Sequence, residues 1–128
     1  MADRVAIKPE GISASPYFSP AIRMGQAVFV SGQAAFDNEG NIVGQGDCGL
    51  QAEFIYERIK TLLEAAGSSM EHVCKTTAFI TDPANYAAFN EVRSRYFPVD
   101  PPASSTVVTN LLRPDMLLEV EAIAVIPS

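Results

Sequence analysis

The stretch from Leu117 to Ile126, LLEVEAIAVI, constrains the fold of this chain more than any other part of the sequence. Branched and aliphatic residues fill it, which is typical of a β-strand, and successive side chains of a strand point to opposite faces of its sheet. One face receives Leu118, Val120, Ala122, Ala124 and Ile126, and the other receives Leu117, Ile123 and Val125 together with Glu119 and Glu121. Both faces of the sheet therefore carry apolar side chains that need cover.

The remaining pattern predicts two helices and four further strands in a single domain over residues 1–128. Apolar residues recur at helical spacing between Asp47, a candidate N-cap, and Gly67, a candidate C-terminal glycine. A second helix is expected to start at Asp82 and Pro83 and to end before Pro98. We expect an extended arm over 1–16, one turn over 68–71, and strands over 26–32, around 42–43 as a hairpin partner, over 73–80, 105–109 and 117–126.

This order of elements predicts an α+β fold in which both helices cover one face of a single sheet. A chain of 128 residues has no third layer left for the other face. A second copy of the chain is the natural cover, and it would also account for a hydrophobic content of 48%. A tight monomer core and a solvated outer face are the alternatives.

Charge and composition exclude several classes of function. The net charge is −6 and the nine Lys and Arg residues are scattered, so we expect no nucleic-acid partner. No segment is long and apolar enough to span a membrane, and the charged N-terminal segment has no secretory pattern, so we expect a cytoplasmic protein. Cys48, Cys74 and the single histidine His72 do not form a set of metal ligands, so we expect no metal.

The two glutamates of the last strand are the candidate chemical groups. Glu119 and Glu121 lie two residues apart on a strand, so their side chains share a face at a spacing of about 6.5–7 Å. Mutual repulsion and burial would raise the pKa of at least one of them, as a general acid/base near neutral pH requires. Pairing with a basic side chain, or a place at the exposed rim of the sheet, is the alternative interpretation.

Short motifs along the chain resemble those of the RidA/YjgF family of imine and enamine deaminases, whose members are also described as endoribonuclease L-PSP-like. In sequence order they are SPY (15–17), IRMG (22–25), FVSGQ (29–33), Gln51, LLEAAGSS (62–69), FITD (79–82), FN (89–90), PPAS (101–104) and EVEAIAV (119–125). The resemblance implies a chorismate-mutase-like subunit with a single mixed sheet, a homotrimer with small-molecule sites between subunits, hydrolysis of a C=N bond, and no cofactor.

The resemblance also suggests roles for individual residues. Glu121 would be the catalytic acid that orients or activates water, with Glu119 as a supporting charge. The substrate-binding residues would be Tyr17, Ser31, Asn90, Ser104, Ser105 and Thr106. Simpler structural roles are open for three of them: an interface aromatic for Tyr17, a strand-end turn residue for Ser31, and a helix-surface amide for Asn90.

The sequence departs from the family in the loop before the penultimate strand. Deaminating members have Pro-Ala-Arg-Ser there, and their arginine holds the substrate carboxylate by a bidentate fork. This chain has Ser104 at the arginine position, and Thr106 where many members have cysteine. Losing that charge predicts a non-standard substrate, for example one of the 2-aminomuconate type, unless Arg23 or Arg113 replaces the missing side chain. A non-catalytic, ligand-binding regulatory trimer is the alternative, and a ribonuclease or translation inhibitor ranks last.

Overall fold

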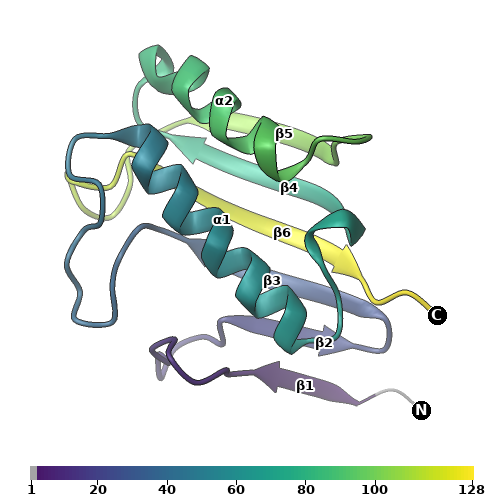
Figure 1. Cartoon of the computed structure of the whole chain (residues 1–128). Helices are drawn as coiled ribbons and strands as arrows, with labels where there is room; N and C mark the ends of the chain where they lie inside the picture. Colours follow the sequence, from purple (N-terminus) through teal and green to yellow (C-terminus); the bar gives the residue numbers. More distant parts are fainter. Residues whose placement is uncertain (1–2) are drawn as a thin grey trace.

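A computed structural model describes residues 3–128 and contains one mixed six-stranded sheet with both helices on the same face (Figure 1). The strands are β1 (Arg4–Ile7), β2 (Ala21–Met24), β3 (Ala27–Gln33), β4 (Val73–Ile80), β5 (Ala103–Val108) and β6 (Leu118–Val125). Their order across the sheet is β1-β2-β3-β6-β4-β5, and only the β4–β5 pair is parallel. The predicted α+β architecture is confirmed.

Local sequence signals mark the ends of α1 and the start of α2. In α1 (Cys48–Ala65) the Asp47 side chain accepts the Leu50 N–H, and Gly67 follows the last turn at a φ of 92°. A short 3₁₀ turn, η2 (Pro83–Asn85), precedes α2 (Tyr86–Tyr96). The predicted cap Asp82 therefore caps η2 rather than α2. A second 3₁₀ turn, η1 (Met70–His72), accounts for the single turn expected before β4.

Two sequence predictions are wrong at the N-terminal side of the sheet. An extended arm is predicted over 1–16; residues 1 and 2 lie outside the described part of the chain, and within the rest Arg4–Ile7 forms β1, which pairs with β2. The strand β2, which the sequence did not predict, pairs in turn with β3. The segment around Ile42 and Val43 makes only an isolated bridge between Phe36 and Ile42 instead of a strand. Strands of four residues, such as β1 and β2, owe their structure to the strands with which they pair. Around Ile42, glycines with positive φ at positions 40, 44 and 46 prevent a longer strand.

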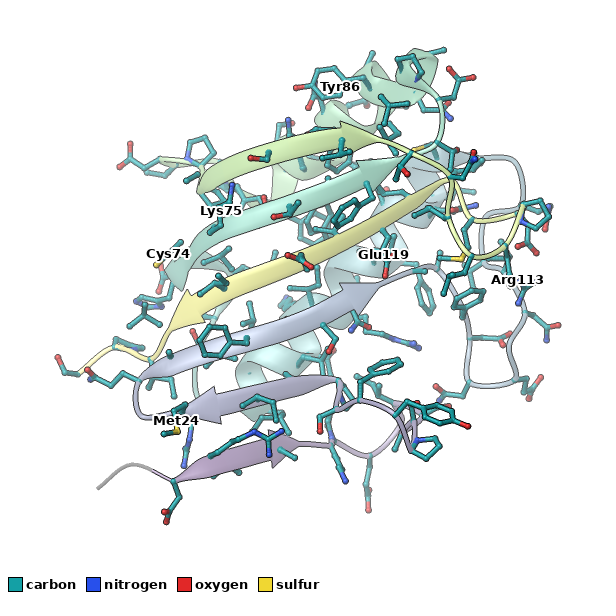
Figure 2. All side chains as sticks on the ribbon, turned by 180° about the vertical axis from the view of Figure 1, so that it is seen from behind. Met24, Cys74, Lys75, Tyr86, Arg113 and Glu119 are labelled. Atoms are coloured by element: carbon teal, nitrogen blue, oxygen red, sulfur yellow. The ribbon has the colours of Figure 1, made fainter. Side chains whose placement is uncertain are left out.

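The two faces of the sheet differ in cover. Leu118, Val120, Ala122 and Ala124 are buried beneath the helices, as the alternation of the last strand predicts. On the opposite face Phe29, Ile123 and Val125 are each at least 40% exposed, and Figure 2 views the molecule from that side. We call this surface the open face. Neither α1 nor α2, the helices of the described residues, is long and apolar enough to cross a membrane.

Candidate functional site

Glu119 lies on β6 where the neighbouring strand β3 is irregular. The register between β3 and β6 shifts between Val30 and Gln33, and Gly32 falls within that shift. A methyl group on Gly32 would overlap the Glu119 carboxylate, so the absence of a side chain at Gly32 makes room for this acid. The strand irregularity and the glycine together define where the carboxylate lies.

A cavity of about 390 Å³ opens beside this carboxylate. It lies at the same end of the sheet as Arg113 (Figure 2). Its walls come from the β1–β2 loop, the end of β3, and the loop before β6, with Ser15, Phe18, Gly32, Phe36, Asp37, Arg58, Leu112, Arg113 and Glu119 among its lining residues. Phe18 is 60% exposed and Leu112 is 95% exposed at this cavity, so the cavity is partly open to solvent. We call it the Glu119 cavity.

The electrostatics of this cavity favour a protonatable acid. Burial, and secondly the negative charge of Glu121, raise the pKa of Glu119 above its ordinary value of 4.5. No ion pair involves Glu119 within residues 3–128. Arg113 lines the same cavity, but its Nε and Nη2 atoms bind both carboxylate oxygens of Asp115 at 3.0 and 2.5 Å. The Arg113 guanidinium is thus held by another acid.

The two residues expected from the N-terminal motifs lie next to this cavity rather than in it. Tyr17 is 91% exposed in the loop between β1 and β2. The Ser31 hydroxyl donates to the Ser19 carbonyl oxygen at 2.6 Å, and the Ser31 N–H donates to the Pro20 carbonyl oxygen at 3.0 Å. These bonds fasten the loop that carries Phe18 over the Glu119 cavity. Ser31 is therefore placed to position this wall.

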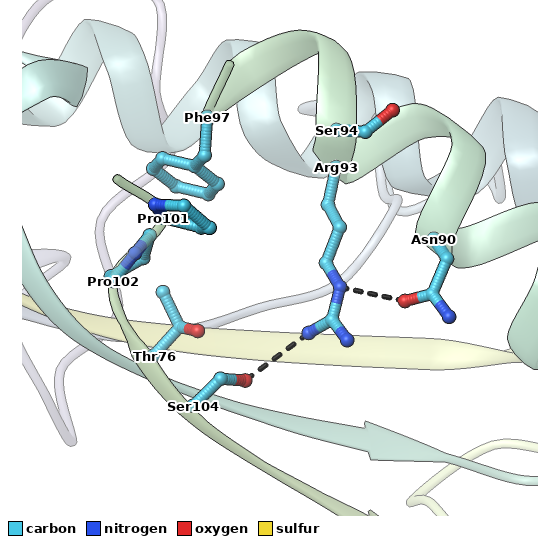
Figure 3. A pocket seen from close by; sticks show the side chains of 8 residues that line it. All are labelled: Thr76, Asn90, Arg93, Ser94, Phe97, Pro101, Pro102 and Ser104. Carbon is cyan, nitrogen blue, oxygen red and sulfur yellow. Dashed lines mark hydrogen bonds between the residues drawn. The ribbon is translucent and has the colours of Figure 1, made fainter. Parts of the chain in front are cut away.

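A second cavity, of about 410 Å³, lies between α2 and β5 (Figure 3). We call it the α2–β5 cavity, and it is lined by Thr76, Asn90, Arg93, Ser94, Phe97, Pro101, Pro102 and Ser104. Thr106 lines an adjoining hollow together with Tyr86, Arg93 and Ser104. The structure therefore brings three of the expected residues, Asn90, Ser104 and Thr106, to one region of the molecule.

Arg93 is the side chain in this region that sequence reasoning missed. Its guanidinium donates to Asn90 Oδ1 at 2.8 Å, to Ser104 Oγ at 3.1 Å and to the Tyr86 hydroxyl at 3.2 Å. Asn90 and Arg93 are three residues apart, so they share a helix face. That spacing was the signal in the sequence that could have identified Arg93.

Ser105 and Glu121 lie apart from both cavities, on the open face. Alternation along β5 sends Ser104 and Thr106 towards α2 and Ser105 to the other side, where Lys75 Nζ donates to the Ser105 hydroxyl at 3.0 Å. Glu121 is exposed, and it pairs across the sheet with Thr77, the residue that also pairs with Ser105. Glu119 therefore lines a cavity, whereas Glu121 faces outward.

Neither of the two arginines considered as substitutes for the missing one reaches Ser104. Arg23 lies on β2 opposite Val28, four strands from β5 in the sheet order. Arg113 belongs to the Glu119 cavity and is bound to Asp115. No group of three or more His, Cys, Asp or Glu side chains that could hold a metal ion occurs within the described part of the chain.

Replacing Gly32 by alanine is expected to displace the Glu119 carboxylate and to lower any activity that depends on it about 10- to 100-fold, while the free energy of unfolding changes by less than about 1 kcal/mol. The added methyl group overlaps only the mobile end of Glu119, so the carboxylate moves and the backbone does not. Steady-state kinetics and urea denaturation measure the two quantities. In a Glu119→Gln background the same substitution should cause little additional loss of that activity. An equal loss in both backgrounds would show that Gly32 does not act through Glu119.

Glu119→Gln is expected to make the protein more stable than the wild type at neutral pH. A carboxyl whose pKa is raised on folding binds protons more tightly in the folded state, so wild-type stability falls as pH rises through the interval above 4.5. The glutamine side chain does not titrate, so the Glu119→Gln variant does not lose stability in this way. The difference between its free energy of unfolding and that of the wild type should grow with pH and then level off. Urea denaturation across that interval measures it. A difference that does not change with pH would show that Glu119 is not the titrating group.

The comparisons with known proteins agree with this geometry. The model of the family described as Endoribonuclease L-PSP matches residues 9–126. A crystal structure of YEO7 from yeast is 31% identical, with 98% of this chain and 100% of that chain covered and a TM-score of 0.89. RidA from the Antarctic bacterium Psychrobacter is 31% identical, with 95% of this chain and 99% of that chain covered and a TM-score of 0.86. The YjgF gene product of E. coli is 28% identical, with 94% of this chain and 98% of that chain covered and a TM-score of 0.85. The mixed sheet and two helices match the chorismate-mutase-like fold of these proteins, and the chain belongs to the endoribonuclease L-PSP family, the family of RidA and YjgF.

Proposed function

We propose that this protein is a hydrolase that cleaves the C=N bond of a reactive imine, or of an enamine after its tautomerisation, and releases ammonia. The observation that supports the proposal is Glu119: a partly buried acid with a raised pKa, at a cavity, without a counter-ion among the described residues. A raised pKa moves the proton exchange of a carboxyl toward neutral pH, as a general acid/base requires. We therefore assign the catalytic role to Glu119 rather than to Glu121.

In the proposed reaction, water attacks the imine carbon while the Glu119 carboxylate accepts a proton from it. The addition forms a C–O bond and moves the C=N electron pair to nitrogen. The protonated Glu119 returns that proton to the nitrogen and gives a carbinolamine. The carboxylate then takes the proton of the new hydroxyl group and passes it to the amine, so that the C–N bond breaks as the C=O bond forms and a carbonyl compound and ammonia leave. One water is consumed for each C=N bond cleaved. The raised pKa of Glu119 serves both steps, because the same group acts first as base and then as acid.

We propose that the working form is a homotrimer. The open face exposes Phe29, Ile123 and Val125, and the Glu119 cavity exposes Phe18 and Leu112. Apolar side chains gathered in this way favour burial against another copy of the chain. In that assembly Glu119 of one protomer would face the α2–β5 cavity of its neighbour, which joins the acid to the pocket containing Asn90 and Ser104. Tyr17 would contribute to closing the shared site.

Ser104 supports a substrate that differs from the small 2-imino acids of the family. The hydroxyl at this position brings no charge of its own. A cavity of about 410 Å³ has room for an extended enamine such as 2-aminomuconate. We do not propose RNA as a substrate, because the net charge of the chain is −6. We propose that the enzyme acts in the cytoplasm.

Ammonia release tests this function directly. The purified protein is incubated with freshly generated 2-iminopropionate and, separately, with 2-aminomuconate, and ammonia is measured against buffer alone. We expect turnover of 2-aminomuconate that exceeds turnover of 2-iminopropionate by about tenfold or more. Rapid turnover of the small imine would refute the interpretation of Ser104. No release above buffer from either compound would refute the proposed hydrolysis, and saturable binding without release would then support a ligand-binding trimer.

A further inference from the structure

Arg93 is a cationic side chain surrounded by neutral partners. Its three hydrogen-bond acceptors are an amide oxygen and two hydroxyl oxygens, those of Asn90, Ser104 and Tyr86. Its guanidinium also lies over the Phe89 ring at 4.6 Å and over the Tyr86 ring at 5.7 Å from the ring centroids. Within residues 3–128 the ion pairs involve other groups and leave Arg93 without an acid. The positive charge at this cavity is therefore uncompensated.

The guanidinium keeps hydrogen-bonding capacity in this arrangement. An arginine has five N–H donors, of which Nε has one and each Nη has two. Nε donates to Asn90, one Nη to Ser104 and the other Nη to Tyr86. One N–H on each Nη thus has no acceptor among the described residues. Two such donors match the two oxygens of a carboxylate.

The neighbouring bonds hold Arg93 at this place before any ligand arrives. Figure 3 shows the side chain reaching from α2 across the cavity to Ser104 on β5, with the bond to Asn90 beside it. The opposite end of the cavity is apolar and consists of Phe97, Pro101 and Pro102. A fixed cation at one end and an apolar wall at the other are what a small organic acid requires.

We propose that Arg93 binds the carboxylate of the substrate and supplies, from helix α2, the guanidinium that strand position 104 lacks. Ser104 is a positioning residue in this arrangement, because its hydroxyl accepts from Arg93 instead of contacting the carboxylate. The inference rests on the proposed function for the identity of the ligand, an imine or enamine that bears a carboxylate. It assigns the binding of the ligand carboxylate to a side chain of α2 instead of a side chain of β5.

Binding of stable product-like acids tests this inference without any turnover. The probes are pyruvate and a longer 2-oxo acid, with pyruvamide as the neutral analogue of pyruvate, and titration calorimetry measures their dissociation constants. We expect Arg93→Gln to weaken binding of the acids about 10- to 100-fold and to leave binding of the amide unchanged. Arg93→Lys should recover only part of the affinity, because lysine keeps the charge and loses the fork.

Arg95→Gln is the matched control, because Arg95 lies on the same helix, is exposed, and forms an ion pair with Glu53 at 2.9 Å. It should bind the acids like the wild type, and circular dichroism verifies that all variants are folded. Equal affinity of wild type and Arg93→Gln for the acids would overturn the inference, as would a wild type that binds none of them. Arg93-dependent binding without ammonia release would support this inference while refuting the proposed hydrolysis.

Discussion

Glu119→Gln is expected to lower the rate of ammonia release about 10²- to 10⁴-fold, which is the usual contribution of a positioned general acid/base. Glutamine preserves the shape of the side chain and removes its ability to exchange a proton. Glu119 is the acid that lines the cavity beside Gly32, and its pKa is raised by burial and by Glu121. Steady-state kinetics with the best substrate found in the ammonia assay measure the loss.

Glu121→Gln is the matched control for this experiment, because Glu121 lies on the same strand and the same face but is exposed. Its effect on the rate should be less than about tenfold, and it acts only through the charge it places near Glu119. A larger loss from Glu121→Gln than from Glu119→Gln would reverse the assignment of the two acids. An unchanged rate in both variants would show that neither carboxylate takes part in the reaction.

Gln51→Leu is expected to lower the free energy of unfolding by about 3 kcal/mol, the largest stability effect that we predict for a single polar side chain. Gln51 is fully buried at the start of α1. Its Nε2 donates to the carbonyl oxygens of Gly44 and Asp115, each at 3.1 Å, and its Oε1 accepts the Leu117 N–H at 2.9 Å. Leucine fills similar space but leaves these three backbone groups without partners.

The same bonds connect stability to function. They join the N-terminal end of α1 to the loop between β5 and β6, two residues before Glu119. Gln51→Leu should therefore lower activity as well as stability. Urea denaturation measures the stability change, and the loop substitution Gln45→Leu, at an exposed position, is its control. A loss below about 1 kcal/mol for Gln51→Leu would show that solvent or a shifted backbone satisfies the freed groups.

The elements predictable from sequence are those whose signals are local. The α1 caps at Asp47 and Gly67, the β-branched run of β4, and the alternation in β6 each specify their structure within a few residues. In contrast, β1 and β2 are four residues long and acquire their structure by pairing with each other and with β3. Nothing within such short segments distinguishes an edge strand from an extended arm.

The candidate site was predictable in its chemistry but not in its geometry. The spacing of Glu119 and Glu121 indicated that one carboxyl would have a raised pKa, but the choice between them depends on the irregularity of β3 at Gly32. The departure from the family motif at Ser104 pointed to the region that the structure shows to be the α2–β5 cavity. The compensating cation, Arg93, comes from another element eleven residues earlier, and only the packing of α2 on β5 brings the two together.

Mixing two inactive variants tests most directly whether Glu119 of one protomer acts on a substrate held by Arg93 of another. Glu119→Gln and Arg93→Gln chains are unfolded, combined in equal amounts and refolded together, and ammonia release is compared with that of each variant refolded alone. A site shared between protomers predicts recovery of about a quarter of the wild-type rate, because one pairing in four at an interface combines two intact residues. Mixed samples that are no more active than the separate variants, although trimers form, would contradict the shared site.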